Sequence, residues 1–149
     1  MNSNKIIGLE SYEIRVGSKE MSLESIHSYL TTSYWSESIS IEVVQKAIEN
    51  SLCVGVFLDD KQIGFARAAT DRATFAYIAD VYILEEHRKN GLSKKLLDTL
   101  FAHPDLQGLR RMMLATRDAH SLYTAYGFTE LNDSKIFMEN WDRDIYTDA

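Results

Sequence analysis

The sequence predicts an α+β fold. Three observations carry this prediction: two segments near the N-terminus have a helical period, three consecutive segments have a period of two, and one strand runs into a glycine and then an apolar helix. With 149 residues, 45% of them hydrophobic, the chain is long enough to bury a full core. Residues 1–149 are therefore expected to form a single domain.

The first third of the chain contains one predicted strand and two predicted helices. The stretch YEIRV (12–16) alternates as a strand does, and Ser22 precedes a helical stretch whose apolar residues share one face. A second helix is predicted from Ile41 to Asn50, because its apolar positions keep a period of 3.6. The stretch TTSYWSES (31–38), between the two helices, is predicted to be a loop.

A three-stranded antiparallel meander follows. Its predicted strands are CVGVFL (53–58), IGFARAAT (63–70) and TFAYIADVYIL (74–84), which alternate with a period of two and are separated by short turns. The last of these leads through Gly91 into a helix whose leucines and phenylalanine form one apolar stripe, at Leu92, Leu96, Leu97, Leu100 and Phe101.

Three further elements complete the predicted order. RMMLAT (111–116) is predicted to be a strand, AHSLYTAY (119–126) a short helix that Gly127 ends, and IFMENW (136–141) the last strand. Asp118 is expected to cap the short helix, because an aspartate side chain can accept hydrogen bonds from the first free amides of a helix.

The composition excludes several classes of protein. A net charge of −6 argues against a broad nucleic-acid surface. No apolar run approaches the roughly 18 residues of a membrane span, and the start of the chain lacks the apolar region of a signal peptide. We therefore expect a cytoplasmic protein without nucleic-acid or membrane partners.

Neither a metal site nor a disulfide is expected. Cys53 is the only cysteine. The four histidines lie far apart and have no ligand spacing, at positions His27, His87, His103 and His120.

A cluster of cations stands out in this acidic chain. Arg88, Lys89, Lys94 and Lys95 surround Gly91, where a helix begins, although helix starts ordinarily favour acidic residues. Free amides at a helix start, together with these cations, make a ready site for a phosphate group. The alternative is that the four cations form a solvated helix face and that Gly91 only permits a turn.

The loop resembles a known coenzyme-binding motif. The acyl-coenzyme A pyrophosphate loop of the GNAT superfamily of N-acetyltransferases follows the pattern Gln/Arg-x-x-Gly-x-Gly/Ala. The chain matches it with a serine at the last position, in the order Arg88, Lys89, Asn90, Gly91, Leu92, Ser93. The resemblance implies that these six residues bind the coenzyme, and Ser93 is a departure from the family.

A second motif of that family lies about thirty residues further on. There the family has a helix of the form Ala-x-x-Leu-Tyr-x-x-aromatic-Gly-Phe, and the chain supplies Ala119, Leu122, Tyr123, Tyr126, Gly127 and Phe128. The order of elements is also similar to the family's. The resemblance thus implies a three-layer α/β/α fold with a mixed, mostly antiparallel central sheet, a splayed central strand pair and about four flanking helices.

The resemblance implies transfer of an acetyl group from acetyl-coenzyme A to a primary amine by direct attack in a ternary complex. The family places backbone donors for the thioester carbonyl at Val81, Tyr82 and Ile83. Tyr123 would donate a hydrogen bond to the leaving thiolate, although its helical spacing also suits a core tyrosine. Thr116 stands where many relatives hold the pantetheine arm with asparagine.

The attacking amine must lose a proton, and Asp80 is the best-placed carboxylate to accept it. It lies within an apolar strand, where a charge needs partners. The alternative is therefore a hydrogen-bonded structural aspartate without a catalytic role.

The acceptor site of the family is formed by the first two helices and the C-terminal strands. Tyr34 and Trp35 are its candidates here, and the same regions also bring Glu37, Phe137, Glu139 and Trp141. An exposed loop and tail of an acidic protein would show the same residue types. We expect a small-molecule or peptide amine as the partner, and a homodimer is compatible with the sequence.

A second functional class stays open on the sequence alone. A fold can persist without its chemistry, so the chain could be a non-catalytic regulatory module that binds acyl-coenzyme A or a nucleotide. Tyr123 favours the enzyme, whereas Ser93 and Thr116 leave room for the binding module.

Overall fold

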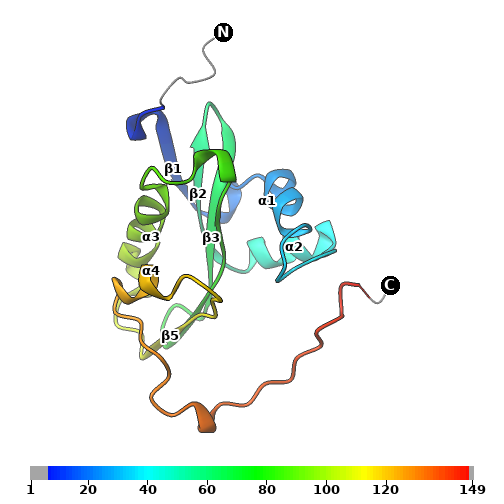
Figure 1. The fold of residues 1–149 in the computed structure, drawn as a ribbon, viewed down its shortest axis with the longest axis vertical. Helices are drawn as coiled ribbons and strands as arrows, with labels where there is room; N and C mark the ends of the chain where they lie inside the picture. The colour runs from blue at the N-terminus through cyan, green and yellow to red at the C-terminus, as the bar shows by residue number, and fades with distance from the viewer. Residues whose placement is uncertain (1–6, 148–149) are drawn as a thin grey trace.

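A computed structural model describes residues 7–147 and contains one five-stranded sheet with strand order β1-β2-β3-β4-β5 (Figure 1). The strands are β1 Tyr12–Val16, β2 Leu52–Leu58, β3 Lys61–Thr70, β4 Phe75–Ile83 and β5 Arg111–Met113. The helices are α1 Leu23–Leu30, α2 Ile41–Glu49, α3 Leu92–Ala102 and α4 His120–Thr124. Short 3-10 turns occur at Leu9–Ser11, Ser18–Glu20, Glu85–His87, Pro104–Leu106 and Ser134–Ile136.

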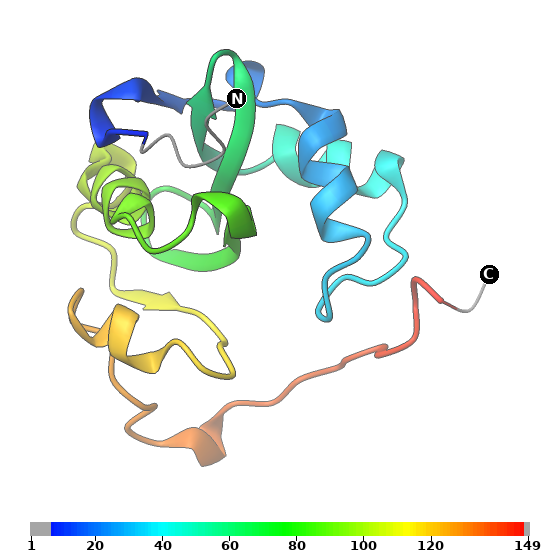
Figure 2. The same cartoon turned by 45° about the horizontal axis from the view of Figure 1, so that its top comes forward.

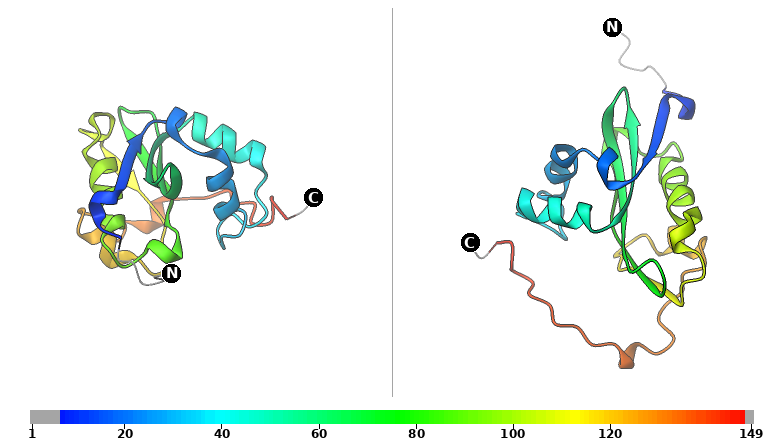
Figure 3. Two further views of the ribbon diagram at one scale, coloured as in Figure 1. Left: turned by 90° about the horizontal axis from the view of Figure 1, so that it is seen from above. Right: turned by 180° about the vertical axis from the view of Figure 1, so that it is seen from behind.

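The helices form a layer on each face of the sheet. Helices α1 and α2 cover one face and α3 covers the other, as the views from above and behind make plain (Figure 3). One buried cluster joins α3 to the sheet, and a second joins α1 and α2 to Cys53, Phe65 and Tyr82 on the opposite face. The predicted α+β class, the three layers and the mostly antiparallel sheet are confirmed.

Local sequence explains where the first two helices begin. The Ser22 hydroxyl accepts a hydrogen bond from the Ser25 amide at 3.2 Å, and Ser40 caps α2 in the same way at Val43. Each cap satisfies one amide that the helix itself leaves free. Both predicted helices and the loop between them are confirmed.

A β-bulge interrupts β4 at Asp80. Phe65 of β3 pairs with Tyr82, but Arg67, two residues along, pairs with Ala79, so β4 holds one extra residue. Asp80 has a φ of 56°, the left-handed conformation that such an insertion allows. The extra residue also shifts the alternation of side chains: Ala76 and Ile78 face α3 before the bulge, and Ile83 does so after it.

The parallel pair β4–β5 is short. Only Phe75, Ala76 and Tyr77 of β4 face β5, opposite Arg111 to Met113. From Ile78 onward β4 therefore has no strand neighbour on that side among the residues described. This is the splayed strand pair that the sequence led us to expect.

One predicted strand is shorter than expected, and another does not exist. Strand β5 ends at Met113 rather than at residue 116, and the stretch 136–141 is not a strand. A strand requires a neighbour to satisfy its backbone groups, and residues 132–147 instead run as an extended segment away from the sheet (Figures 1 and 3). Alternation along the chain could not reveal that a partner strand was missing.

None of the helices within residues 7–147 has both the length and the apolar character needed to cross a lipid bilayer.

The contact of α3 with the sheet gives a direct test of this core. Leu96 of α3 is fully buried, whereas Val43 of α2 is 42% exposed. We expect Leu96→Ala to lower the free energy of unfolding by about 2–5 kcal/mol, because it leaves a cavity. The control Val43→Ala is expected to cost less than about 1 kcal/mol. Equal losses in urea denaturation would contradict this packing.

Candidate active site

The bulge in β4 is held by an ion pair across two strands. The Asp80 carboxylate accepts a hydrogen bond from Nε of Arg67 at 2.6 Å, and the two side chains are only 9% and 20% exposed. Arg67 also donates to the Ser51 hydroxyl at 3.2 Å. Both charges are therefore partnered between the apolar residues that flank them in β3 and β4, as nearly buried charges must be.

The loop between α1 and α2 reaches the same carboxylate. Nε1 of Trp35 donates to the second oxygen of Asp80 at 2.9 Å, and the ring of Tyr34 packs edge-on against Trp35. The Arg117 guanidinium lies 4.1 Å from the Tyr34 ring centroid, a cation–π contact. Two exposed aromatic residues that the sequence placed in a loop are thus fixed beside Asp80.

Aromatic stacking continues from this loop into the core. Tyr29 of α1 stacks on Tyr82 of β4 with ring centroids 3.9 Å apart, and Tyr29 also lies 6.1 Å from Trp35. The Tyr82 hydroxyl is buried and has no hydrogen-bond partner in the described part of the chain, and burial raises its pKa well above the usual range. Tyr82 therefore stays neutral and supports the loop between α1 and α2 through its stacking on Tyr29.

Arg88 folds back onto the end of β4. Nε of Arg88 donates to the Ile83 carbonyl at 2.7 Å, and its guanidinium also donates to the Tyr29 hydroxyl at 3.2 Å. Arg88 therefore turns back onto the protein and fixes the path of the chain from β4 into the following loop. Of the three backbone positions predicted to polarise a thioester, Tyr82 and Ile83 pair with β3 on one side and lie on the open edge on the other.

The start of α3 has the properties of an anion site. Gly91, its N-cap, has a φ of 85°, and Lys89, two residues earlier, has a φ of 67°. No side chain caps the helix, and its first turn contains no acidic residue, so the first amides are left free. The Asn90 side-chain oxygen is buried nearby, and no residue that the structure describes forms a hydrogen bond with it. These groups fit a polyanionic ligand that also carries hydrogen-bond donors.

The four cations around Gly91 divide into two pairs. Arg88 is bound to the protein as described, and Nζ of Lys94 bonds Asp98 at 2.7 Å. The Tyr126 hydroxyl donates to the same Asp98 at 2.7 Å, and these two bonds hold the pKa of that carboxyl below its usual value. Within residues 7–147, Lys89 and Lys95 form no ion pair and stay free for a ligand.

Tyr123 lies on α4 and faces the core. It is 7% exposed, its ring packs edge-on against Phe128, and its hydroxyl makes no hydrogen bond within residues 7–147. Burial raises the pKa of Tyr123 to about 12. At any ordinary pH the residue therefore carries a proton that it can share but does not release.

Thr116 has a local role that the sequence assigned to Asp118. The Ala119 amide donates to the Thr116 hydroxyl at 3.1 Å, and α4 has no side-chain cap of its own. The expected cap by Asp118 was wrong. Threonine, three residues before Ala119, closes the turn that leads into the helix, and its hydroxyl hydrogen remains available to donate.

The structure brings some of the predicted residues together and separates others. Asp80, Trp35 and Tyr34 meet at the bulge, and the 88–93 loop follows directly from the same strand. Phe137 lies instead under Arg111, which is opposite the first residue of β4 and so at the other end of that strand. Glu139 and Trp141 belong to the extended C-terminal segment and are exposed.

Arg67 and Tyr29 were missed by the sequence analysis. Arg67 had a usable signal, since it is a lone cation in an apolar strand adjacent to the strand that holds Asp80. Tyr29 had none, because its stacking partner is far away in the chain.

No group of three or more histidine, cysteine, aspartate or glutamate side chains in the described part of the chain is arranged to hold a metal ion.

The fold and this site define an acyltransferase class, and comparisons with known proteins agree. Residues 20–128 match the model of the acetyltransferase (GNAT) family. A candidate acetyltransferase of Gibberella zeae, FG08082, is 29% identical over 126 residues, which are 69% of this chain and 70% of that protein.

Solved structures give the same result. A candidate GNAT acetyltransferase from Xanthomonas campestris is 44% identical, with a TM-score of 0.88 over 91% of this chain and 96% of its own. An acetyltransferase from Clostridium acetobutylicum, solved with acetyl-CoA, shares the fold at 18% identity, with a TM-score of 0.66 over 87% and 95% of the two chains. The chain therefore belongs to the acetyltransferase (GNAT) family and is an acyltransferase.

The Arg67–Asp80 pair gives a test of what holds the site. We expect Arg67→Met to lower the free energy of unfolding by about 2–4 kcal/mol, because it leaves the Asp80 carboxylate nearly buried without its cation. The double variant Arg67→Met/Asp80→Asn should recover part of this loss, which a double-mutant cycle in urea measures directly. Strictly additive losses would show that the pair does not couple the two strands.

Proposed function

We propose that the chain transfers the acetyl group of acetyl-coenzyme A to a primary amine by direct attack, with both substrates bound together. One observation carries the proposal: a short connection, residues 84–91, leads from the strand whose outer edge is open beyond Tyr77 to the uncapped start of α3. A phosphate site and a row of free backbone groups thus lie next to each other in the chain. Coenzyme A has a diphosphate at one end and an amide-containing arm leading to its thioester at the other.

The diphosphate is assigned to the start of α3. The free amides after Gly91 donate to its oxygens. Lys89 and Lys95 add positive charge, since neither forms an ion pair within residues 7–147. The Ser93 hydroxyl replaces a small residue of the family pattern and can add one more donor. Arg88 supports this loop through its bond to Ile83.

The open edge of β4 is assigned to the thioester. When the amine attacks the carbonyl carbon, negative charge develops on the carbonyl oxygen, and a preorganised backbone N–H stabilises it. The positions Val81, Tyr82 and Ile83 follow the bulge and lack a strand neighbour on the outer side among the residues described. The bulge at Asp80 sets which of their amides face outward.

Tyr123 is assigned to the leaving sulfur. A thiol has a pKa of about 8.5, so full proton transfer from a tyrosine at about 12 is uphill by about 3.5 units, or about 5 kcal/mol. Tyr123 therefore stabilises the thiolate by a hydrogen bond that strengthens as the carbon–sulfur bond breaks. The thiolate then takes its proton from solvent.

The amine proton is assigned to Asp80, directly or through one water. Its two oxygens already accept bonds from Arg67 and Trp35, and each has a further lone pair. Tyr34 and Trp35 would border the path by which the amine, small or peptidic, approaches.

An Asp80→Asn variant is expected to need a higher pH for activity; a pH–rate profile that stays unchanged would leave Asp80 with a structural role alone.

Cys53 supports direct attack rather than a covalent relay. The thiol is fully buried, and burial raises its pKa to about 11, so it is neither accessible nor ionised near neutral pH. An acyl-cysteine intermediate at this residue is thereby disfavoured.

The coenzyme site can be tested with two matched glycine variants. Gly91 and Gly108 both have positive φ, 85° and 73°, and an added Cβ would meet no atom closer than 3.9 Å at either. Each change to alanine should therefore cost about 1–2 kcal/mol of stability through backbone strain. Only Gly91→Ala should also weaken coenzyme A binding, by about tenfold or more in titration calorimetry. No heat with the unmodified protein would remove the proposed function.

The Tyr123 role can be tested by removing one oxygen. We expect Tyr123→Phe to lower kcat about 10- to 1000-fold, with acetyl-coenzyme A affinity little changed, in an assay of thiol release across a panel of amines. Tyr126→Phe is the control, because that hydroxyl is bound to Asp98 on the surface, and it should stay within about twofold. A Tyr123→Phe enzyme as fast as the parent would contradict the assignment.

The same panel separates the two functional classes. Thiol release that depends on an amine supports catalysis. Binding of the coenzyme without thiol release from any amine would identify a regulatory binding module instead.

A further inference from the structure

The segment between β5 and α4 contacts the loop between α1 and α2 through Arg117. The guanidinium carbon of Arg117 lies 4.1 Å from the centroid of the Tyr34 ring. Tyr34 packs edge-on against Trp35, with ring centroids 5.0 Å apart, and Nε1 of Trp35 donates to Asp80 at 2.9 Å. Three successive contacts therefore connect Arg117 to the carboxylate that is assigned to the amine proton.

The Arg117 side chain has no acidic partner among residues 7–147. It takes part in no ion pair and no hydrogen bond there, although the whole chain has 22 acidic residues against 16 basic ones. Arg15, Arg67 and Arg72, by contrast, each bind a carboxylate. Because an arginine that stacks on an aromatic face keeps the N–H groups at its edge free, Arg117 is held in place and its donors stay available.

The acidic residues nearest to this contact in the sequence do not neutralise it. Asp118 follows Arg117 directly, and Glu37 belongs to the same loop as Tyr34. Both are exposed, and neither forms an ion pair within the part of the chain that the structure describes. An anionic ligand at Arg117 would therefore displace no carboxylate of these residues.

The two rings between Arg117 and Asp80 are accessible from solvent. Tyr34 is 58% exposed and Trp35 is 39% exposed. In Figure 2 the C-terminal arm, residues 132–147, passes below this region, from the end under α4 to the side of α1 and α2. A molecule that lay across the two rings would meet a negative charge at one end and a positive charge at the other. The apolar ring surfaces between these charges suit an aliphatic chain.

We propose that Arg117 binds an anionic group of the acceptor, which is then an amine with a carboxylate or phosphate several bonds away from its nitrogen. This inference rests on the acetyltransferase function proposed above. A primary amine with a pKa of about 10.4 arrives protonated at neutral pH, so Asp80 attracts the end that is to be acetylated. Arg117 attracts the other end and orients the nitrogen toward the open edge of β4. A chain of net charge −6 needs such a local cation to bind an anionic acceptor.

The same contacts restrict the length of the acceptor. Because two ring systems separate Arg117 from Asp80, a very small molecule cannot reach both charges. In an α-amino acid the amine and the carboxylate are attached to one carbon, so only one of them can meet its partner. An ω-amino acid or an aminoalkyl phosphate with a longer aliphatic chain can reach both.

The first experiment compares acceptors that differ only in charge. Thiol release from acetyl-coenzyme A is measured with δ-aminovalerate and ε-aminocaproate, each against the amino alcohol of the same length. We expect kcat/KM to be about tenfold or more higher for the amino acid, because hydrogen bonds to a charged group are the stronger ones. Added salt should reduce this preference. Glycine should have no such advantage over ethanolamine, and aminoalkyl phosphates of the same lengths decide between carboxylate and phosphate.

The second experiment changes the cation. In Arg117→Gln the preference for the ω-amino acid over its amino alcohol should fall by about tenfold or more, whereas Arg117→Lys should keep part of it. Arg117→Glu should instead favour a diamine of the same length, because the sign of the charge at this position is reversed.

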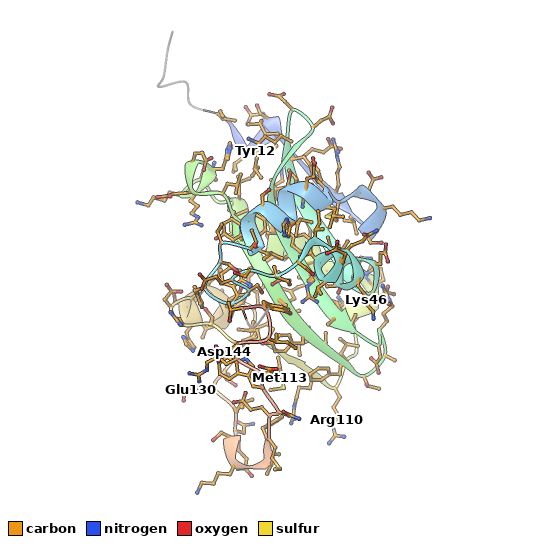
Figure 4. The ribbon with its side chains drawn as sticks, turned by 90° about the vertical axis from the view of Figure 1, so that its right-hand side faces the viewer. Tyr12, Lys46, Arg110, Met113, Glu130 and Asp144 are labelled. Carbon is orange, nitrogen blue, oxygen red and sulfur yellow. The ribbon has the colours of Figure 1, made fainter. Side chains whose placement is uncertain are left out.

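Arg111→Gln is the matched control. Arg111 is also an exposed arginine over an aromatic ring, 4.8 Å from the centroid of Phe137, and it too has no ion pair within residues 7–147. Strand β5 runs from the side marked by Arg110 to Met113 in Figure 4, so Arg111 lies at the opposite end of β5 from the segment that carries Arg117. The preference should stay within about twofold of the parent's in this control.

Two results would overturn the inference alone: a parent enzyme that acetylates the uncharged amines as fast as the ω-amino acids and aminoalkyl phosphates, or an equal change of preference in Arg117→Gln and Arg111→Gln. Thiol release with no amine at all would overturn the proposed function and this inference together. The comparison of acceptors on the parent enzyme needs no substitution, so it decides the question even if a variant fails to fold.

Discussion

The bulge at Asp80 is the constraint on which the site depends. One extra residue in β4 changes which side chains and which backbone groups face each side of the sheet beyond it. Such an insertion is stable only if its left-handed residue is fixed, and the Arg67–Asp80 pair fixes it from the neighbouring strand. The same carboxylate anchors Trp35, so one charge pair positions both the open strand edge and the aromatic loop beside it.

The path of the chain after the bulge connects this edge to the uncapped start of α3. Arg88 ties the loop to the end of β4, and Gly91 then turns the backbone so that α3 begins without a cap. Helix α3 is held against the sheet by four buried leucines, so its free amides point in a fixed direction. Strand edge and helix start are thus held in a fixed arrangement, as the proposed coenzyme site requires.

Burial decides the chemistry of the groups around this surface. Desolvation raises the pKa of both Tyr123 and Cys53, so each keeps its proton near neutral pH. The C-terminal arm shows the opposite condition, because it leaves apolar side chains in water and strand-forming backbone unpaired. Only near its end does this segment return to the body, where Tyr146 lines a small pocket together with Arg67 and Asp80 of the bulge.

The sequence by itself determined the helices, the meander, the turn at Gly91 and the two family motifs, because capping, periodicity and a glycine conformation are set by residues close together in the chain. It did not reveal the Arg67–Asp80 pair, the bond from Trp35 to Asp80 or the return of Arg88 onto Ile83, since these depend on how separate elements pack. The predicted strand at 136–141 failed for the same reason. Alternation is a local property, but a strand exists only where tertiary structure supplies a neighbour, and within its own described chain this segment has none.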